Sequence, residues 1–431
     1  MKSVAFHTLG CKVNQTETEA LEKLFQDAGY VVVPFKAEAD IYVVNTCTVT
    51  HLSDSKSRQA VRRARRTNPD AVIVVTGCYA QVAAEEIFAI PEVDLVIGTH
   101  ARESLPQLVV QAKEKRLNCV SPLEEKECFE ELPAAQNSSR TRAFLKVQEG
   151  CRQFCSYCIV PYARGPLYSL PAKKAIDETK RLSDQGYSEL VLTGVNLGAY
   201  GNDLPETQTL SELISLIAPI QGIARIRLSS VEPTEITGEL IDEISSNNKV
   251  CRHLHIPLQS GSDEILQRMN RKYRAAEYYY LLNCLLERVP GIALTTDVIV
   301  GFPGETEAHF LHTLSLVERL GFSRLHVFKY SPRRGTPAAG FSGQVPANVK
   351  EERSRRLIAL GEELAARYRA SFIGRIVQVL FEKETAPGQY SGLSEHYLRI
   401  TVRARDDLRG QLKKVLVVGE EDGALFAELL P

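Results

Sequence analysis

The amino-acid sequence predicts an α/β protein with a doubly wound parallel sheet first, a partial parallel (βα)6 barrel next and a small antiparallel β-barrel last. Two observations lead to this prediction. Short β-rich runs alternate with amphipathic helical runs through most of the 431 residues, a pattern typical of parallel sheets. Beyond residue 371 the alternation stops, and short strands follow one another without helices between them.

The N-terminal domain, residues 1–114, is expected to form the doubly wound sheet. The run TETEALEKLFQDAG (16–29) has the apolar period of a helix and ends at Gly29, the residue type that most often follows a helix. A polar and charged segment over 115–141 is expected to be a linker. Five runs indicate buried parallel strands, at residues 4–9, 30–35, 40–45, 71–77 and 93–98.

The central domain, residues 142–368, contains six further β-rich runs with helical patterns between most of them. Six βα units in a row predict a parallel barrel whose functional site lies at the carboxyl ends of its strands. Residues 370–431 are expected to form the small antiparallel barrel. The six strands of the central domain are expected at 143–150, 189–194, 224–230, 252–259, 293–302 and 324–331.

The charges of the chain nearly balance, with 52 Lys and Arg against 53 Asp and Glu, so no global field attracts nucleic acid or an anionic membrane. No apolar run is long enough to span a bilayer, and the N-terminus turns polar too early for a signal peptide. We therefore expect a cytoplasmic chain without membrane contact, whose thiols stay reduced. Its ten cysteines are then expected to be metal ligands and core residues.

One cysteine triplet lies directly after the first predicted barrel strand. The stretch CRQFCSYCIVPYARG (151–165) places Cys151, Cys155 and Cys158 in C-x3-C-x2-C spacing. A loop at this place presents the thiolates at the catalytic face of a barrel. Three thiolates suit an iron–sulfur cluster whose fourth iron is open. A zinc site is the alternative, although zinc sites favour a second pair of ligands and the sequence shows none.

A second triplet, Cys11, Cys47 and Cys78, occurs in HTLGC, VVNTC and VVTGC, and each cysteine follows a predicted strand by one to three residues. The carboxyl ends of parallel strands lie along one edge of a sheet, so we expect the three sulfurs to converge there. Neighbouring strands are about 5 Å apart, within reach of one cluster. The pattern predicts a second three-thiolate cluster. Cysteines that pack as small hydrophobic residues are the alternative.

These motifs together resemble the methylthiotransferase family of radical S-adenosylmethionine (SAM) enzymes, and the resemblance covers nearly the whole chain. The last barrel resembles the TRAM domain, an RNA-binding module. The opening LGCKVNQTE is most similar to the subgroup that methylthiolates N6-threonylcarbamoyladenosine at position 37 of tRNA, next to the anticodon. Besides 151–165, the resemblance is carried by HTLGCKVNQTETE (7–19), LHIPLQSGSDEILQRMNRKY (254–273), DVIVGFPGET (297–306) and FKYSPRRGTPAA (328–339).

The resemblance implies two [4Fe-4S] clusters and SAM as cofactors. One SAM, bound at the open iron of the 151–158 motif, would be cleaved to a 5′-deoxyadenosyl radical, and another would supply the methyl group. The cluster of the N-terminal cysteines would hold the sulfur. The implied partners are tRNA and an electron donor of the flavodoxin or ferredoxin type, and we expect a monomer.

Further residues are expected to contact SAM, with turns and helix caps as the alternative role. They are Tyr157, Gly194, Asn196, Ser230, Gln259 and Gly301. One departure from the family stands in GPLYS, where Tyr168 occupies the place of a usual arginine. A neutral tyrosine has neither the positive charge of an arginine nor a planar guanidinium that can donate two parallel hydrogen bonds, so the sequence does not assign a role to this loop.

Two arginine-rich runs are expected to contact RNA, with a merely solvated face as the alternative. KSRQAVRRARR (56–66) carries six basic residues and no acid on one helix, and the two-residue alternation of YLRITVRAR (397–405) puts its arginines on one side of a strand. The residues are Arg58, Arg62, Arg63, Arg66, Arg399, Arg403 and Arg405.

Three other functions remain open on the sequence. The target could be isopentenyladenosine in tRNA or a ribosomal-protein side chain, which keeps the chemistry and changes the substrate. A non-catalytic iron–sulfur or zinc protein that binds RNA belongs to a different class. A complete set of barrel strand-end motifs argues against that class, because a binding module has no need of a SAM cavity.

Overall fold

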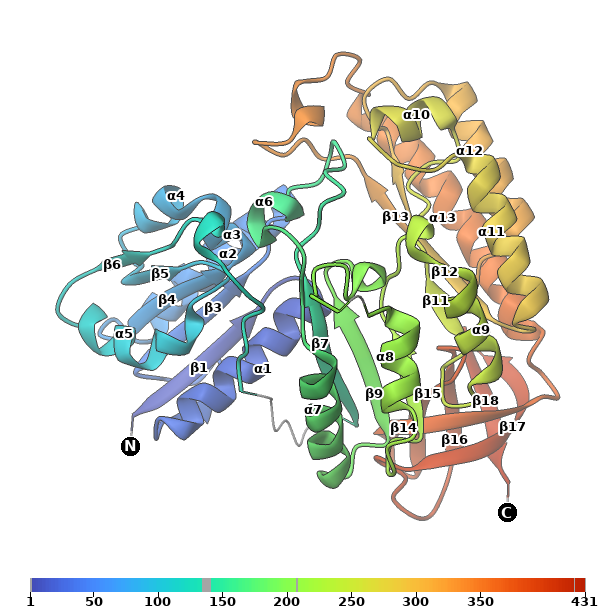
Figure 1. Cartoon of the computed structure of the whole chain (residues 1–431), viewed down its shortest axis with the longest axis horizontal. Coiled ribbons are helices and arrows are strands. Elements are labelled where there is room, and N and C mark those ends of the chain that lie inside the picture. The colour runs from blue at the N-terminus through green and yellow to red at the C-terminus, as the bar shows by residue number, and fades with distance from the viewer. Residues whose placement is uncertain (1, 134–140, 207, 422, 431) are drawn as a thin grey trace. The chain divides into compact units, whose positions relative to one another are not determined.

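The structure is a computed structural model that describes residues 2–133, 141–206, 208–421 and 423–430. The chain, which Figure 1 colours by residue number, divides into two compact units. The first, which we call the cysteine unit, comprises residues 1–137, 148–169 and 331–339. The second, the barrel unit, comprises residues 138–147, 170–330 and 340–431. Both cysteine triplets belong to the cysteine unit.

The cysteine unit is built on a six-stranded parallel sheet in the order β2-β1-β3-β4-β5-β6, which confirms the predicted doubly wound class. Its last strand, β6, lies within the segment that we expected to be a linker, and residues 134–140 of that segment lie outside the described residues. The strands are β1 (Ser3–Thr8), β2 (Val31–Val33), β3 (Ile41–Thr46), β4 (Val72–Gly77), β5 (Leu95–Ile97) and β6 (Leu117–Cys119). The α-helices are α1 (Lys12–Asp27), α2 (His51–Thr67), α3 (Cys78–Val82), α4 (Ala84–Phe88), α5 (Leu105–Ala112) and α6 (Val160–Arg164).

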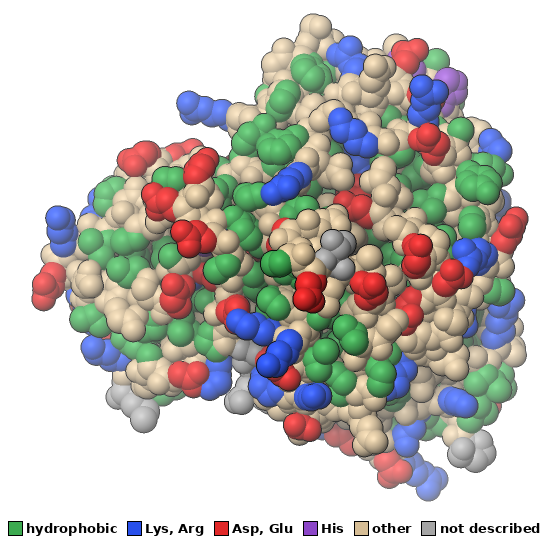
Figure 2. Space-filling view, viewed as in Figure 1, with side chains coloured by type: hydrophobic (Ala, Val, Ile, Leu, Met, Phe, Trp, Pro, Cys, Tyr) green, Lys and Arg blue, Asp and Glu red, His purple; other side chains and the backbone are tan. Residues whose placement is uncertain are grey.

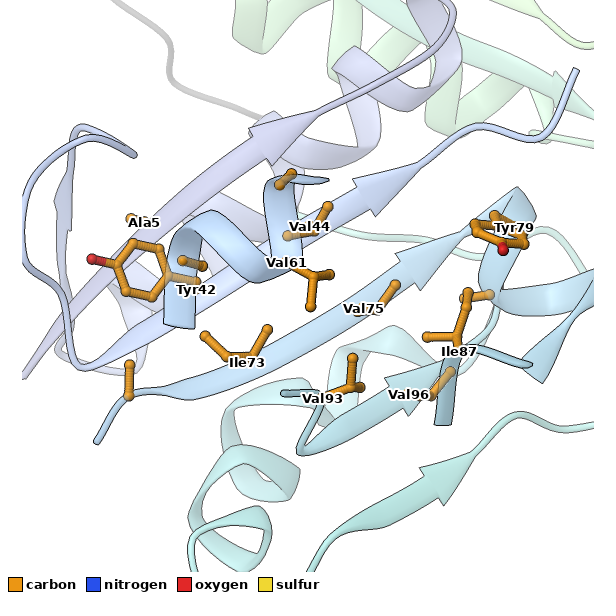
Figure 3. Packing of buried hydrophobic residues seen from close by; sticks show 14 of the residues in the cluster. Ala5, Tyr42, Val44, Val61, Ile73, Val75, Tyr79, Ile87, Val93 and Val96 are labelled. Carbon is orange, nitrogen blue, oxygen red and sulfur yellow. The ribbon is translucent and has the colours of Figure 1, made fainter. Parts of the chain in front are cut away.

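Helices cover both faces of this sheet. Figure 3 shows one face, where Val44 and Val75 pack with Val61 of α2 in an apolar layer. On the opposite face, Val43 packs with Phe25 of α1. Val43 and Val44 are adjacent in sequence, and successive side chains of a strand point to opposite faces. The continuous apolar runs of β3 and β4 therefore follow from burial on both sides of the sheet.

The barrel unit contains the six predicted parallel-barrel strands in sequence order. Strand β7 is followed by β9 and β10 in one sheet, and β11, β12 and β13 form another. Parallel bridges from Ile226 to Val250 and from Ser230 to His255 join the two sheets. The strands are β7 (Arg142–Glu149), β9 (Glu189–Gly194), β10 (Arg225–Leu228), β11 (His253–His255), β12 (Ala293–Val300) and β13 (Arg324–Lys329).

The α-helices of the barrel unit lie between these strands or follow the last of them, as the βα pattern predicts (Figure 1). They are α7 (Ala172–Asp184), α8 (Leu210–Ile217), α9 (Gly238–Ser246), α10 (Asp263–Arg268), α11 (Ala275–Arg288), α12 (Glu307–Leu320) and α13 (Ala347–Ala370). In the cysteine unit, the short β8 (Tyr168–Ser169) pairs antiparallel with the end of β7 at Gln148 and Glu149.

The end of the chain forms a closed five-stranded barrel in the order β14-β15-β16-β18-β17. The predicted antiparallel pairing holds for four neighbouring pairs and is wrong for β16 and β18, which run parallel. A closed ring with an odd number of strands cannot alternate in direction at every neighbour, so one parallel pair is unavoidable. The strands are β14 (Ile376–Ala386), β15 (Gln389–Ser394), β16 (Arg399–Arg403), β17 (Leu412–Glu421) and β18 (Ala424–Leu429).

A buried charge cluster joins this small barrel to β10 within the barrel unit. The carboxylate of Glu189 binds Arg227 at 2.8 Å and also pairs with Arg225. The two guanidinium groups then donate to barrel carbonyls, Arg225 to Leu393 at 2.7 Å and Arg227 to Ser394 at 2.9 Å. If the small barrel moved away from β10, the two buried guanidinium groups would lose the carbonyl oxygens of Leu393 and Ser394. Loss of these partners is costly for a buried charge, so the contacts hold the small barrel on β10.

The surface carries both signs of charge. Figure 2 shows acidic and basic side chains interspersed on one face, in keeping with a formal net charge of −1. Among the described residues, no helix combines the length and the apolar character needed to cross a bilayer.

Candidate functional site

The N-terminal cysteines follow three neighbouring strand ends. Cys47 comes directly after β3, Cys78 directly after β4, and Cys11 after β1 at the position that precedes α1. The register pairs Thr46 with Gly77, so β3 and β4 end level with each other. The backbone at Gly10 lies so close to Cys47 that an added Cβ would be 2.9 Å from the Cys47 Cβ, which leaves room only for glycine.

Asn14, on the first turn of α1, ties the loops of this triplet together. Its Nδ2 donates to the carbonyl of Leu9 at 3.0 Å and to the carbonyl of Thr46 at 2.9 Å, just before Cys47. Its Oδ1 lies 3.5 Å from the Sγ of Cys11. Asn14 is 1% exposed, so these bonds are made away from water and hold the loops of Cys11 and Cys47 in one arrangement.

Arg164 brings a cation to the third cysteine. Its Nε donates to the Sγ of Cys78 at 3.1 Å, and its Nη2 donates to the Oδ1 of Asn14 at 2.9 Å. The remaining donors bind carboxylates, Nη2 to Glu17 at 3.0 Å and Nη1 to Glu149 at 3.0 Å. Arg164 is 2% exposed, so it sits among these partners as a buried guanidinium paired on every side.

The electrostatics of the triplet disfavour three free thiolates. Burial raises the pKa of Cys78 to about 11 and also raises the pKa of Cys47. The charge of Arg164 lowers the pKa of both groups, whereas the nearby Cys11 raises it. The strand register and the hydrogen bonds of Asn14 place the three cysteine loops at one edge of the sheet. Three thiolates there need a bound cation to offset their repulsion and burial, and a metal cluster supplies that charge.

This donor set fits a cluster better than a single ion. Within the described parts of the chain, no three His, Cys, Asp or Glu side chains are arranged to hold one metal ion. A four-iron cluster makes a different demand, because each thiolate binds a different iron and the sulfurs do not meet at one point. We therefore expect the cysteine loops at three adjacent strand ends to hold a cluster, and this ligand set stays a prediction.

The second triplet lies in the loop between β7 and α6. Cys155 is buried and Cys151 and Cys158 are half-buried. The Cys158 amide donates to the Cys155 carbonyl at 2.9 Å, which closes a tight turn between two of the predicted ligands. The base of the loop is closed by the Cys151 amide, which donates to the carbonyl of Gly165 at 3.1 Å. Phe154 has φ of +46°, a strained conformation for a bulky residue, inside this loop.

Residues 331–339 fasten this loop to the loop after Cys47. Arg333 donates to the carboxylate of Asp54 at 2.7 Å and also binds the Thr48 hydroxyl, next to Cys47. Further along the same segment, the Ala338 amide donates to the Ser156 carbonyl at 2.8 Å, next to Cys155. The segment FKYSPRRGTPAA therefore connects the two cysteine triplets.

Lys126 explains the departure at Tyr168. The Nζ of Lys126 lies 2.9 Å from the Glu149 carboxylate and 4.9 Å from the centre of the Tyr168 ring. The Tyr168 hydroxyl donates to the backbone carbonyl of Lys126. The segment expected to be a linker thus supplies a buried cation beside the tyrosine that replaces the expected arginine.

The other residues predicted to contact SAM lie at strand ends of the barrel unit, except Tyr157, which is half-buried in the cysteine loop. Gly194 ends β9, and the Nδ2 of the buried Asn196 donates to Glu235 at 2.8 Å. Ser230 forms the bridge to His255 at the end of β10. Their contact with SAM stays a prediction.

Gln259 and Gly301 both have left-handed backbones, with φ of +62° and +71°. The Gly301 amide donates to Glu305 at 2.7 Å, and an added Cβ would lie 2.3 Å from the Cγ of Lys350. The turn itself therefore requires glycine at this position, and the contact of Gln259 and Gly301 with SAM stays a prediction.

The arginines of α2 divide into two groups. Arg62, Arg63 and Arg66 lie on the outer face of the helix, whereas Arg58 is half-buried and donates to Tyr79 at 2.7 Å. Arg58 is thus partly committed to a structural contact. In the small barrel, β16 turns Ile400 and Val402 inward and leaves its two arginines exposed, as the alternation predicts. These are Arg399 and Arg403 on the strand, and Arg405 follows just beyond it.

Two known families match parts of the chain, Uncharacterized protein family UPF0004 over residues 3–98 and the Radical SAM superfamily over residues 145–317. Across 97% of this chain and 94% of the relative, 46% of residues are identical to the threonylcarbamoyladenosine tRNA methylthiotransferase MtaB of Bacillus subtilis. The chain belongs to the methylthiotransferase family of radical SAM enzymes.

Other methylthiotransferases are also similar. MtaB of Thermotoga maritima is 39% identical over 93% of this chain and 91% of its own length. The tRNA-2-methylthio-N(6)-dimethylallyladenosine synthase of Moorella thermoacetica is 38% identical over 100% of this chain and 98% of its own length. Among solved structures, the radical S-adenosylmethionine methyltransferase TsrM of Kitasatospora setae has a TM-score of 0.58 at 15% identity, covering 79% of this chain and 77% of that chain. At this identity the likeness concerns the fold alone.

Sequence reasoning missed the residues whose hydrogen bonds hold the loops of the two cysteine triplets. Arg164 and Arg333 lie inside two of the family motifs, PYARG and SPRRG, and the motifs alone assign a buried role to neither. Asn14 lies in LGCKVNQ, and nothing in that run indicates its contacts with Leu9 and Thr46. The one available signal was an arginine placed next to predicted cluster ligands, where a cation could offset thiolate charge.

Proposed function

We propose that this chain converts N6-threonylcarbamoyladenosine at position 37 of tRNA to its 2-methylthio derivative, using one SAM as methyl donor and one as radical source. The observation that carries the proposal is the presence of two cysteine triplets in one compact unit, connected by residues 331–339 and by Arg164. The name of the Bacillus subtilis relative supports the substrate.

The proposed ligands divide between the triplets. Cys11, Cys47 and Cys78 would hold the auxiliary cluster, and the 151–158 motif would hold the radical SAM cluster. When bound, the clusters and SAM supply the radical chemistry that activates an aromatic C–H bond, which ordinary side-chain bases cannot do usefully. The chain's own part is to fix the loops, through Asn14 and Arg333, and to provide the positive charge of Arg164 beside a thiolate.

Two exposed aromatic rings, one inside the 151–158 motif and one just after it, support an RNA substrate. Phe154 and Tyr162 are 48% and 43% exposed, and their ring centres are 5.7 Å apart in an edge-on arrangement. Single-stranded RNA bases stack on such rings. Phe154 has a left-handed backbone conformation, which glycine or asparagine adopts most easily. The presence of a strained and exposed phenylalanine at this position therefore needs a further explanation. We assign these rings to contact with the substrate nucleotide or its neighbour.

The remaining RNA contacts in the proposal are electrostatic. Arg62, Arg63 and Arg66 on α2 would bind phosphates, with Arg58 contributing less because Tyr79 engages it. The arginines at 399, 403 and 405 would serve the same purpose on the TRAM-like barrel. We further propose a monomer in the cytoplasm that receives electrons from a flavodoxin or ferredoxin type of donor.

The test is a reaction with purified components. Anaerobically reconstituted protein, SAM and dithionite are mixed with tRNA that carries threonylcarbamoyladenosine, and nucleosides are analysed by mass spectrometry. The proposal requires the 2-methylthio nucleoside and 5′-deoxyadenosine. A parallel reaction with tRNA that carries isopentenyladenosine tests the alternative substrate, which the name of the Moorella thermoacetica relative motivates. Product from that tRNA alone would overturn the substrate assignment.

A further inference from the structure

Arg164 belongs by sequence to one cysteine triplet and by contact to the other. It ends α6, directly after the loop of Cys151, Cys155 and Cys158. Its Nε nevertheless donates to the sulfur of Cys78, 86 residues earlier in the chain. Arg164 is 2% exposed and Cys78 is 9% exposed, so the hydrogen bond between them is made away from water.

Charge neutralisation of the buried network does not explain this contact. Glu17 and Glu149 already pair with Arg164 and offset its charge. Arg102 in the same network shows what such pairing alone looks like, because it is fully buried and its guanidinium binds the carboxylates of Glu17 and Glu130. The Nε of Arg164 is turned to a sulfur instead, so the sulfur contact is a separate feature of this residue.

A hydrogen bond to a cluster-ligating sulfur stabilises the reduced, more negative cluster and raises its reduction potential. Because Glu17 and Glu149 already offset the charge of the guanidinium, the hydrogen bond to the sulfur is the part of Arg164 that acts on the cluster. We propose that Arg164 is a positioning residue that raises the reduction potential of the cluster held by Cys11, Cys47 and Cys78. This inference rests on the proposed function, because it requires the auxiliary cluster.

The experiment uses the reconstituted full chain and its Arg164→Gln, Arg164→Lys and Arg102→Gln variants. Redox titration is followed by low-temperature electron paramagnetic resonance, and the radical SAM cluster is recognised because its signal changes when SAM is added. We expect Arg164→Gln to lower the midpoint of the cluster that does not respond to SAM. Arg164→Lys keeps the positive charge but loses the planar guanidinium, so it should lower this midpoint potential less than Arg164→Gln does. Arg102→Gln is the control, because it removes a buried cation of the same network that contacts Glu17 and Glu130, and it should lower that midpoint less than Arg164→Gln does.

Two results would overturn the inference: an unchanged midpoint in Arg164→Gln, or an equal shift in Arg102→Gln. Circular dichroism checks that each variant is folded. Should Arg164→Gln not fold, Glu17→Gln is a nearly isosteric substitute that removes a carboxylate competing for Arg164. It should raise the midpoint, and a lowered or unchanged value would contradict us. Iron analysis of the unmodified protein separates the two proposals, because a single bound cluster would refute the proposed function itself.

Discussion

A hydrogen bond of 3.1 Å joins the Nε of Arg164 to the Sγ of Cys78. Cys78 belongs to the N-terminal cysteine triplet and directly follows β4, whereas Arg164 ends the helix that follows the 151–158 motif. The bond therefore links the loops that we propose to hold the two clusters. Asn14 extends the link to Cys11, since its Oδ1 contacts both Arg164 and the Cys11 sulfur.

Substitution of single cysteines should separate the two proposed clusters. Cys155→Ala should abolish SAM cleavage, because a cluster with two thiolates is unstable. Cys47→Ala should leave SAM cleavage measurable and stop sulfur insertion. The measurement is the yield of 5′-deoxyadenosine and of thioether product in the same reaction. Normal cleavage by Cys155→Ala, or thioether product from Cys47→Ala, would refute the corresponding assignment.

The pair of Lys126 and Tyr168 should behave as one coupled unit. Tyr168→Arg places a second cation beside Lys126 and should destabilise the folded protein by roughly 1–3 kcal/mol. In a Lys126→Met background the same arginine can pair with the Glu149 carboxylate left by the lysine, so the destabilisation that it causes should be smaller.

Urea unfolding of the four proteins of this double-mutant cycle measures the coupling. Tyr168→Phe is the control and should cost only about 1 kcal/mol, because it removes one hydroxyl hydrogen bond. Additive costs would show that the two residues are independent.

The outward-facing arginines of α2 should set the salt dependence of tRNA binding. Substitution of Arg62, Arg63 and Arg66 by alanine should weaken binding and reduce the slope of log Kd against log salt by about 1 for each phosphate that is no longer neutralised. Fluorescence anisotropy with labelled tRNA over a range of salt concentrations gives the slope. The control is Arg367→Ala on α13, whose side chain is 64% exposed. An unchanged slope in the triple variant would remove α2 from the RNA interface.

Acid should destabilise the small C-terminal barrel through His396. Burial, together with the positive charges of Arg252, Arg227 and Arg375, lowers the pKa of this histidine to about 4 from an ordinary value of 6.5. The folded state thus holds His396 neutral while the unfolded state takes up a proton. Its stabilising contribution is complete above pH 6.5 and is lost as the pH falls toward 4, roughly 3 kcal/mol in all.

Urea unfolding at pH 8 and pH 5.5 measures this effect. The protein should lose about 1 kcal/mol more over that interval than a His396→Gln variant does. His312→Gln on α12 is the control, because its side chain is exposed and it should keep the full pH dependence. The ring of His396 packs edge-on against Phe372, with ring centres 4.7 Å apart, and its Nδ1 lies 3.9 Å from a carboxylate oxygen of Glu395. A variant with the same pH dependence as the unsubstituted protein would contradict this account.

The fold class could be predicted because hydrophobic period and strand order are local properties of the sequence. Val43 and Val44 both being apolar indicates a strand buried on two faces, and the strand-end positions of Cys47 and Cys78 follow from it. Strand β6 was missed because LNC is short and polar and contributes to the sheet only as its edge strand. The parallel pair of β16 and β18 follows from barrel closure, which no single segment reveals.

The supporting residues of the site could not be predicted for a related reason. Arg164 acquires its role from Cys78 and Glu17, which are 86 and 147 residues away in sequence. Lys126 lies in a stretch whose charge suggested a solvated linker, yet it is buried by its contacts with Glu149 and Tyr168. Such long-range pairing of charges leaves no periodic pattern in the sequence.

The central claim is tested most directly by the modified nucleosides of tRNA from cells with and without the gene for this chain, measured by mass spectrometry. The account predicts that loss of the gene removes 2-methylthio-N6-threonylcarbamoyladenosine and lets N6-threonylcarbamoyladenosine accumulate. An unchanged level of the 2-methylthio form would contradict the assigned substrate. A loss confined to the isopentenyladenosine derivative would identify the other tRNA nucleoside as the target.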